Sequence, residues 1–187
     1  TLSGERVGGE IKKLLAASDP ALALAGMRAT GVLAAILPSA DDRALAPLVH
    51  LEAEQGVSPD PIRRLAALTG EDVTVALRLS KAEARHHAQI VRAMSEMQSP
   101  AELAYRWGAS RALDIMLVRA ALFETDFDPK NHAEIARGAA AVCPVKSADF
   151  IAVVQGAALG QALNDCQARW IASDFQLTRK ALLTPLQ

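Results

Sequence analysis

Aromatic side chains are scarce in this sequence, where Phe, Trp and Tyr together make up 4% of 187 residues. Cysteine is scarcer still. Cys143 and Cys166 lack metal-site spacing, so we expect both to be buried, reduced thiols. No apolar run reaches the roughly 18 residues of a membrane-spanning helix, and the sequence shows no signal peptide. These absences argue against a disulfide-stabilised or membrane-spanning protein and predict a cytoplasmic one.

A surplus of positive charge is also missing. The chain has 20 Lys and Arg against 21 Asp and Glu, for a net charge of −1. Residues 1–100 hold 11 basic and 12 acidic side chains, and the remainder holds nine of each. Nucleic-acid-binding domains usually show a cationic surplus. The counts therefore give no support for nucleic-acid binding, although a local basic face remains compatible with them.

Helix-forming residues are abundant. Hydrophobic residues make up 51% of the chain, which is enough to bury a core. Ala and Leu dominate and runs of β-branched residues are few, a composition that favours helices. Alternation with period two never persists long enough for a sheet. We therefore predict an all-α fold, a multi-helix array of about ten to thirteen short helices.

Recurring start signals divide the chain into helices. An N-cap Asp followed by Pro at the first helical position occurs three times, and two further segments fit a capping box. These segments are Asp19-Pro20, Asp60-Pro61, Asp128-Pro129, Ser80–Glu83 and Ser99–Glu102. Gly31 suits the end of the helix that starts at Pro20.

These signals and the apolar spacing set the expected helix bounds. We expect helices at 4–17, 20–30, 32–37, 41–55, 61–69, 71–78, 81–97, 100–107, 110–124 and 130–142, then two or three more to 183. Pro47 should kink or split the fourth. The segment from Leu113 to Leu122 is apolar nearly all round, so it should be a central buried helix. A weak boundary near Cys143-Pro144 predicts a body at 1–143 and a tail at 144–187.

Few residue patterns point to chemistry. His86 and His87 are helical neighbours whose side chains diverge by about 100°, so a surface or packing role is favoured over a metal pair. Gly8-Gly9 lies inside a helical pattern, which it weakens, and is no phosphate loop. Asp126 and Asp128 have the spacing of an Mg²⁺ pair, but the following Pro favours Asp128 as an N-cap. An independent metalloenzyme that uses these carboxylates and the histidines is a third hypothesis.

The start of the chain resembles a family. Residues 2–15, Leu-Ser-Gly-Glu-Arg-Val-Gly-Gly-Glu-Ile-Lys-Lys-Leu-Leu, resemble the segment that closes the neck of class II tRNA nucleotidyltransferases (CCA-adding enzymes) and bacterial poly(A) polymerases. That segment reads Ser-x-Glu-Arg-Ile, two polar residues, Glu-Leu and x-Lys-Leu-Leu. The matching residues are Glu5, Arg6, Glu10, Lys13, Leu14 and Leu15.

Later segments resemble the same family in order along the chain. They are Asp19–Met27, Gly31–Leu33 with Leu37-Pro38, Leu77–Glu83, Asp149, Gly156–Gly160, and Arg169–Ile171 with Phe175. Two departures stand out. Gly8-Gly9 replaces two helix-favouring polar residues, and Ala157 stands where the tail turn often has Pro.

The resemblance implies that the parent enzyme adds nucleotides, as CCA or poly(A), to RNA 3′ ends. It would use ATP, or ATP and CTP, with Mg²⁺ in an N-terminal catalytic head that precedes Thr1. This chain, which starts without Met, would be the neck end, body and tail, with no catalytic residue, metal or cofactor of its own. The implied partners are RNA, above all tRNA, and the enzyme's own head, with neither membrane nor DNA. CCA addition and poly(A) addition are not distinguished.

The resemblance also implies roles for particular residues. Glu5 and Arg6 would brace the neck through a charge-assisted hydrogen bond, with a solvated salt bridge as the alternative. Arg side chains suit phosphate, aromatic rings stack on bases, and amides at a helix start receive phosphate. The candidates for RNA contact are Tyr105, Arg106, Arg111, Gly156 and Gly160. The alternative function is a non-enzymatic helical protein-interaction domain, which the balanced charge favours.

Overall fold

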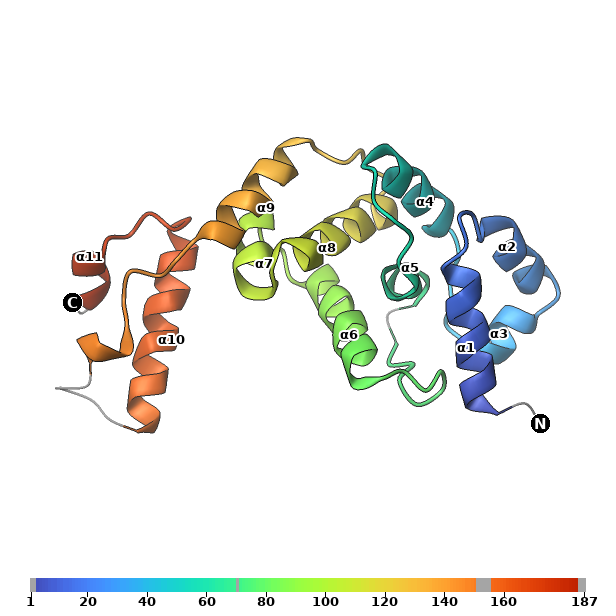
Figure 1. Cartoon of the computed structure of the whole chain (residues 1–187), viewed down its shortest axis with the longest axis horizontal. Coiled ribbons are helices and arrows are strands. Elements are labelled where there is room, and N and C mark those ends of the chain that lie inside the picture. The colour runs from blue at the N-terminus through green and yellow to red at the C-terminus, as the bar shows by residue number, and fades with distance from the viewer. Residues whose placement is uncertain (1–2, 70, 151–155, 185–187) are drawn as a thin grey trace. The chain divides into compact units, whose positions relative to one another are not determined.

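A computed structural model of the chain describes residues 3–69, 71–150 and 156–184, and these ranges contain helices and turns but no strand (Figure 1). The predicted all-α array is confirmed. The chain divides into two compact units, Thr1–Gly138 and Ala139–Gln187. The helices of the first unit are α1 (Gly4–Leu15), α2 (Ala21–Ala29), α3 (Val32–Ile36), α4 (Leu45–Glu54), α5 (Pro61–Leu68), α6 (Lys81–Ser95), α7 (Pro100–Trp107), α8 (Ala109–Leu122) and most of α9 (Lys130–Ala140).

Side-chain caps start several helices where the sequence predicts them. Asp60 Oδ1 accepts from the backbone amides of Ile62 and Arg63 at 2.8 Å each. Ser80 and Glu83 form both arms of a capping box, at 2.7 and 3.3 Å. Because a cap uses residues three apart in the chain, its position follows from local sequence alone.

The predicted cap before α9 is confirmed as well. Asp128 Oδ1 accepts from the Lys130 amide at 2.9 Å. Phe127 is buried, and its ring centroid lies 5.2 Å from that of His132. With Asp128 as the N-cap, these two rings occupy the positions that form a hydrophobic staple. This carboxylate therefore orders a helix start.

The helix predicted at 71–78 is wrong, because the chain forms only a tight turn there. Leu77 N donates to Val73 O at 2.9 Å, but Arg78 then adopts a left-handed φ of 49°. Leu79 N reaches back to Thr74 O at 3.0 Å, which closes the turn. The turn buries Val73 and Leu77 in the core. Tertiary packing thus overrides a weak local helix preference.

Pro47 does not kink a helix, which corrects the second expectation. Helix α4 begins at Leu45, so Pro47 is its third residue. The first amides of a helix have no partner within it, so a missing N–H costs nothing there. The preceding residues, expected to be helical, form a loop in which Asp41 N donates to Leu68 O at 2.8 Å.

The second unit contains the short 3₁₀ helix η1 (Ser147–Asp149), α10 (Ala157–Ala172) and α11 (Arg179–Leu183). Trp170 is buried, and its ring meets Phe175 edge to face at 4.9 Å. Cys166 is buried as predicted, whereas Cys143 is half-buried. Asp149 pairs with Arg179, whose hydrogen bond lowers the pKa of the carboxyl to about 2. None of the described helices is long and apolar enough to span a membrane.

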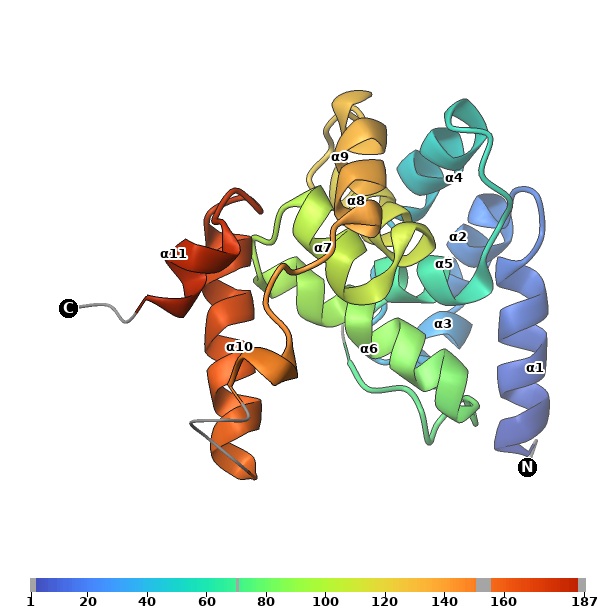
Figure 2. The ribbon, with the colours of Figure 1, turned by 60° about the vertical axis from the view of Figure 1, so that its left-hand side comes forward.

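Two glycines allow close helix contacts in the first unit. A Cβ on Gly8 would lie 1.9 Å from Leu77 O, and one on Gly138 would lie 2.0 Å from Ala101 O. Gly8 therefore lets α1 contact the 71–79 turn, and Gly138 lets α9 pack on α7 (Figure 2). Gly9, in contrast, faces open space.

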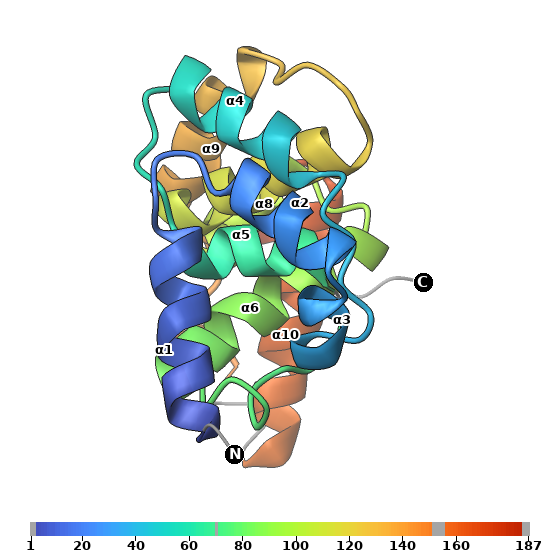
Figure 3. The ribbon, with the colours of Figure 1, turned by 90° about the vertical axis from the view of Figure 1, so that its right-hand side faces the viewer.

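Helix α5 lies at the centre of the first unit and contacts α1, α4, α6 and α8 (Figure 3). Every residue from Ile62 to Leu68 is buried. Ala66 and Ala67 belong to a core cluster with α4, α6, α7 and α8, while Leu65 belongs to a second cluster with α1, α2 and α3. The predicted central helix, α8, is buried on most of its surface, but α5 is the element that joins both cores.

Two buried arginines make α5 unusual, and their burial is not evident from the sequence. Arg63 contacts Glu52 Oε1 at 2.7 Å and Asp114 Oδ1 at 2.8 Å, and Arg64 contacts Glu52 Oε2 at 2.6 Å. Arg64 also donates to Leu15 O at 2.7 Å and thereby caps the end of α1. This network of Arg63, Arg64, Glu52 and Asp114 links α1, α4, α5 and α8.

The two adjacent glycines of α1 should respond oppositely to substitution. Gly8→Ala forces backbone apart at Leu77 O and should lower the free energy of unfolding by about 1–3 kcal/mol. Gly9→Ala meets no atoms and should raise it by up to about 1 kcal/mol, because Ala favours helix. Urea denaturation followed by circular dichroism measures both. Equal effects of the two substitutions would contradict the close contact at Gly8.

Glu52→Gln should lower the free energy of unfolding by about 3–5 kcal/mol, because it leaves buried guanidinium charge without its carboxylate. The matched control is Glu54→Gln in the same helix, where the side chain is 51% exposed. Chemical denaturation of both variants gives the comparison. A loss of stability no larger than that of the control would show that the network contributes little.

Candidate nucleic-acid interface

Two predicted RNA-contacting residues, Arg106 and Arg111, line one hollow of about 370 Å³. Arg106 lies in the last turn of α7 and Arg111 in the first turn of α8. Gly108 separates the two helices with a φ of 89°, and both arginines line the same hollow beside it. Helix α6 forms the opposite wall. This arginine hollow is lined by Ala82, Arg85, His86, Gln89, Arg106, Trp107 and Arg111.

Positive charge dominates the arginine hollow. Arg106 Nε contacts Glu102 Oε1 at 2.8 Å, and Arg111 contacts Asp114 Oδ2 at 3.2 Å. Arg85 is exposed and makes no ion pair within the described part of the chain. Each guanidinium has five N–H donors, so even the paired arginines retain donors for another anion. The hollow therefore suits a phosphate-sized anion.

Asp114 forms the buried base of this arrangement. Its Oδ2 also contacts His86 Nε2 at 2.9 Å, while its Oδ1 contacts Arg63. Burial by itself would raise the pKa of Asp114, but hydrogen bonds from His86 and Arg63 outweigh burial and lower it. The carboxylate is thus ionised, and it ties the first turn of α8 to the buried network. His86 has the packing role predicted for it.

The residues of the α6 wall were not among the predicted RNA contacts. Ala82, Arg85, His86 and Gln89 follow the spacing i, i+3, i+4 and i+7, so they share one helix face. That polar face was visible in the sequence. Its position opposite Arg106 and Arg111 was not, because it depends on how α6 packs against α8.

The other predicted site residues lie elsewhere. Tyr105 is half-buried on α7 and does not line the hollow. Gly156 opens α10 with a φ of 61°, and both it and Gly160 belong to the second unit. Glu5 and Arg6 are exposed in the first turn of α1. Within the described residues they form no ion pair with each other.

A second hollow, of about 480 Å³, lies on another side of α6 against the 71–74 segment. We call it the histidine hollow, after the buried His87 in its wall. It is lined by Glu71, Asp72, Thr74, Ala84, Arg85, His87, Ala88, Val91 and Arg92. Arg85 lines both this hollow and the arginine hollow, so α6 separates two neighbouring sites.

Burial lowers the pKa of His87 below its ordinary value of 6.5, although a hydrogen bond to the Thr69 backbone and the charge of Asp72 oppose the shift. The imidazole is therefore neutral at pH 7. Its Nε2 atom is buried without a hydrogen-bond partner among the described residues. His87, like His86, is buried rather than exposed.

An apolar groove of about 350 Å³ lies along α1. Five of its lining side chains are apolar and two are charged. They are Val7, Ile11, Leu14, Met27 and Ile36, with Arg6 and Glu10. Arg6 thus borders an apolar surface, and such surfaces mark contact sites for proteins more often than for phosphate.

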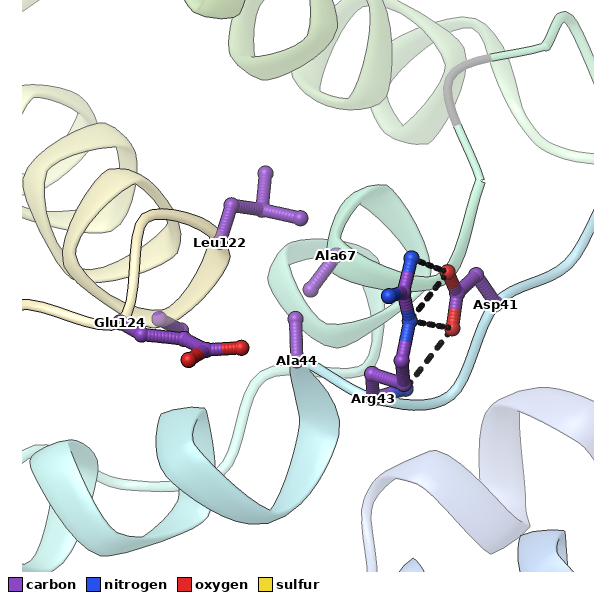
Figure 4. A pocket seen from close by; sticks show the side chains of 7 residues that line it. Asp41, Arg43, Ala44, Ala67, Leu122 and Glu124 are labelled. Carbon is purple, nitrogen blue, oxygen red and sulfur yellow. Dashed lines mark hydrogen bonds and ion pairs between the residues drawn. The ribbon is translucent and has the colours of Figure 1, made fainter.

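A fourth hollow, of about 120 Å³, is a weak candidate for a binding site (Figure 4). It is small, and two of its charged side chains already bind each other. Arg43 and Asp41 form a fork, with Nη2 at 2.6 Å and Nε at 2.8 Å from Oδ2. The hydrogen bonds from Arg43 lower the pKa of Asp41. Glu124 lies on the other side of the hollow. The charges of Arg43 and Asp41 thus compensate each other.

A metal centre finds no support in the part of the chain that the structure describes. No group of three or more His, Cys, Asp or Glu side chains is placed there to hold an ion. Asp128 is engaged in capping α9. The described residues therefore do not fit the Mg²⁺ of a nucleotidyl-transfer centre, and no catalytic step follows from them.

Residues 1–43 match the protein-family model described as "Probable RNA and SrmB- binding site of polymerase A". A search of curated proteins found no match. The matched segment contains α1, α2, α3 and the apolar groove, and it supports a relationship to the poly(A) polymerase family and RNA as a partner. The arginine hollow lies beyond the matched residues.

The neutral His87 makes stability depend on pH. Because its folded-state pKa is lowered, the folded chain binds fewer protons than the unfolded chain just below pH 6.5. The contribution of the neutral His87 side chain to the free energy of unfolding is complete above pH 6.5. It is lost as the pH falls toward the lower pKa of the folded state. His87→Gln should therefore flatten the fall in unfolding free energy between about pH 7.5 and 5.5.

Urea denaturation at several pH values tests this expectation. His50→Gln removes an imidazole that is 72% exposed and serves as the matched substitution. A fall in stability that is as steep in His87→Gln as in the unsubstituted chain would contradict the role of His87. So would an equal flattening by His50→Gln.

Proposed function

We propose that this chain is the RNA-holding region of a poly(A) polymerase-like enzyme that adds nucleotides to RNA 3′ ends. Two independent observations support the proposal. The family model matched at residues 1–43 is described as an RNA-binding site. The arginine hollow lies outside that match and supplies the chemistry that binds a nucleic-acid backbone.

The convergence of Arg85, Arg106 and Arg111 on one hollow carries the proposal. Guanidinium forks match phosphate oxygens in geometry and charge. Trp107, at the same hollow, adds an aromatic surface, and bases stack on such surfaces with little sequence preference. A phosphate with an adjoining base is therefore the ligand that suits this site best.

The resemblance of the whole chain to class II nucleotidyltransferases favours tRNA as the RNA. On this proposal the reaction, whether CCA or poly(A) addition, takes place in a separate catalytic head. The head, in the cytoplasm, would hold Mg²⁺ and bind ATP or CTP. Gly156–Gly160 at the start of α10 would add a second phosphate contact, and Glu5 and Arg6 would brace the neck.

A protein-binding role is the second candidate, and the apolar groove favours it. Val7, Ile11 and Leu14 present a helical apolar stripe along α1. The matched family's description includes binding of SrmB, so the groove is our candidate for a protein contact of that kind. The two roles use different surfaces and are separable by substitution.

A titration of labelled single-stranded RNA with the full chain tests RNA binding. We expect saturable binding that weakens as salt rises, because bound phosphates release counterions. Arg85→Gln with Arg106→Gln should lower the affinity by about tenfold for each lost charge-assisted contact. It should also reduce the dependence of the affinity on salt.

Arg43→Gln is the matched control, since it removes an exposed arginine from the same unit but away from the hollow. Absence of saturable RNA binding would overturn the proposed function. Equal losses in the control and the double variant would show that binding is unspecific attraction. Substitution of Leu14 by Ala should leave RNA binding intact, because Leu14 lines the apolar groove and packs against the second core cluster, not the arginine hollow.

A further inference from the structure

We propose that the arginine hollow binds one unpaired nucleotide, whose base stacks on Trp107 and hydrogen-bonds to the side-chain amide of Gln89. The inference rests on the proposed function, because it concerns the same hollow. It adds a requirement that phosphate contacts alone cannot impose, since paired and unpaired RNA both present phosphates. Gln89 is then the residue that recognises an unpaired base.

Each wall of the hollow carries one guanidinium and one group suited to a base. Helix α6 contributes Arg85 and Gln89, which lie four residues apart on one helix face, with Cβ atoms about 5–6 Å from each other. At the end of α7, Arg106 is followed directly by Trp107. A base is joined to its phosphate through a single sugar. A nucleotide whose phosphate meets the arginines therefore has its base within reach of Gln89 and Trp107.

The amide of Gln89 is available to a ligand. Its side chain makes no hydrogen bond within the described residues, whereas Gln55, Gln98 and Gln161 each bond to another side chain. Gln89 is half-buried, yet its amide oxygen and nitrogen are not among the buried polar atoms that lack a partner there. Both atoms are therefore open to solvent and can exchange water for a ligand.

Trp107 is a fixed aromatic surface. It is half-buried and packs against the core cluster that α8 shares with α4, α6 and α7. Its indole N–H makes no hydrogen bond in the part of the chain that the structure describes. A ring that the core already holds loses little conformational freedom when a base stacks on it. Such stacking accepts every base, because each has a π face.

The amide of Gln89 requires an unpaired base without selecting one base. A carboxamide has a donor and an acceptor side by side. The Watson–Crick edge of each base also has a donor beside an acceptor, so the amide can pair with any of them after turning over. In a duplex these edges are paired and the bases are stacked. A base can therefore enter this site only from a single strand, a loop or a bulge.

The size of the hollow agrees with this ligand. Its volume of about 370 Å³ falls within the roughly 300–1,000 Å³ of pockets that hold small molecules. One nucleotide fits such a space, whereas a duplex can only lay its backbone across the opening. An unpaired nucleotide also avoids the cost of unstacking, which a base drawn from an intact duplex would carry.

The test measures the affinity of the full chain for three RNAs. They are a fully paired blunt duplex, the same duplex with one extra nucleotide bulged from one strand, and the bulged duplex with an abasic residue at the bulge. The base at the bulge should raise the affinity about tenfold or more over both other duplexes, because it adds a stacking contact and hydrogen bonds.

Gln89→Met keeps the length of the side chain but removes both hydrogen-bonding atoms, and it should reduce the preference for the bulge about threefold or more. Gln55→Met is the matched control, since Gln55 is a half-buried glutamine of the same unit that does not line the hollow. Trp107→Leu should also reduce the preference. Because Trp107 packs on the core, Gln89→Met is the variant that decides where Trp107→Leu does not fold.

The outcomes separate the two proposals. Equal affinity for the paired and bulged duplexes, with both still weakened by Arg85→Gln and Arg106→Gln, would overturn the unpaired-nucleotide site and leave the proposed function standing. A preference for the bulge that survives removal of its base, or that Gln89→Met leaves intact, would also overturn the site. Failure to bind these RNAs and single-stranded RNA would overturn both proposals. A preference that Gln89→Met reduces and Gln55→Met does not would support the assignment.

Discussion

The first unit depends on one buried interaction, the sharing of the Glu52 carboxylate between Arg63 and Arg64. Buried charges are costly unless every partner is in place, so this network has few alternative arrangements. Glu52 sets α4 against α5, and Arg64 sets the end of α1 against both through Leu15 O. Apolar packing of the two cores supplies most of the attraction. The network decides which arrangement that attraction produces.

The candidate RNA site inherits its geometry from the same network. Asp114 contacts Arg63 on the buried side and Arg111 toward the arginine hollow. His86, from α6, meets the same carboxylate. The walls of the hollow are therefore joined through one residue, and a change in the core would alter the spacing of the arginines. This coupling explains why a nearly neutral chain can present a defined basic surface.

The arginines of this chain differ in burial and in the groups that they bind. Arg119 donates to Ala93 O at 2.6 Å and Gln98 O at 2.7 Å, and so closes the end of α6. Arg64 does the same for α1. Arg85 remains exposed beside the hollows. A count of charges treats all of these arginines alike. The balance of 20 basic and 21 acidic residues therefore did not indicate whether the chain binds RNA. Only their burial separates structural arginines from those available to a ligand.

Sequence alone determined the helical class, most helix starts and the cap at Asp128, because each depends on contacts between residues three or four apart. It also identified Arg106 and Arg111, through resemblance, as candidates. Tertiary structure decided the rest. The 71–78 segment became a turn because Leu77 O packs on Gly8, more than sixty residues away. Arg63 and Arg64 entered the core, and Arg85 and His87 came to flank hollows, because helices distant in the chain packed there. Such long-range contacts leave no pattern in the local sequence, because each of the two residues in contact could equally well be exposed to solvent.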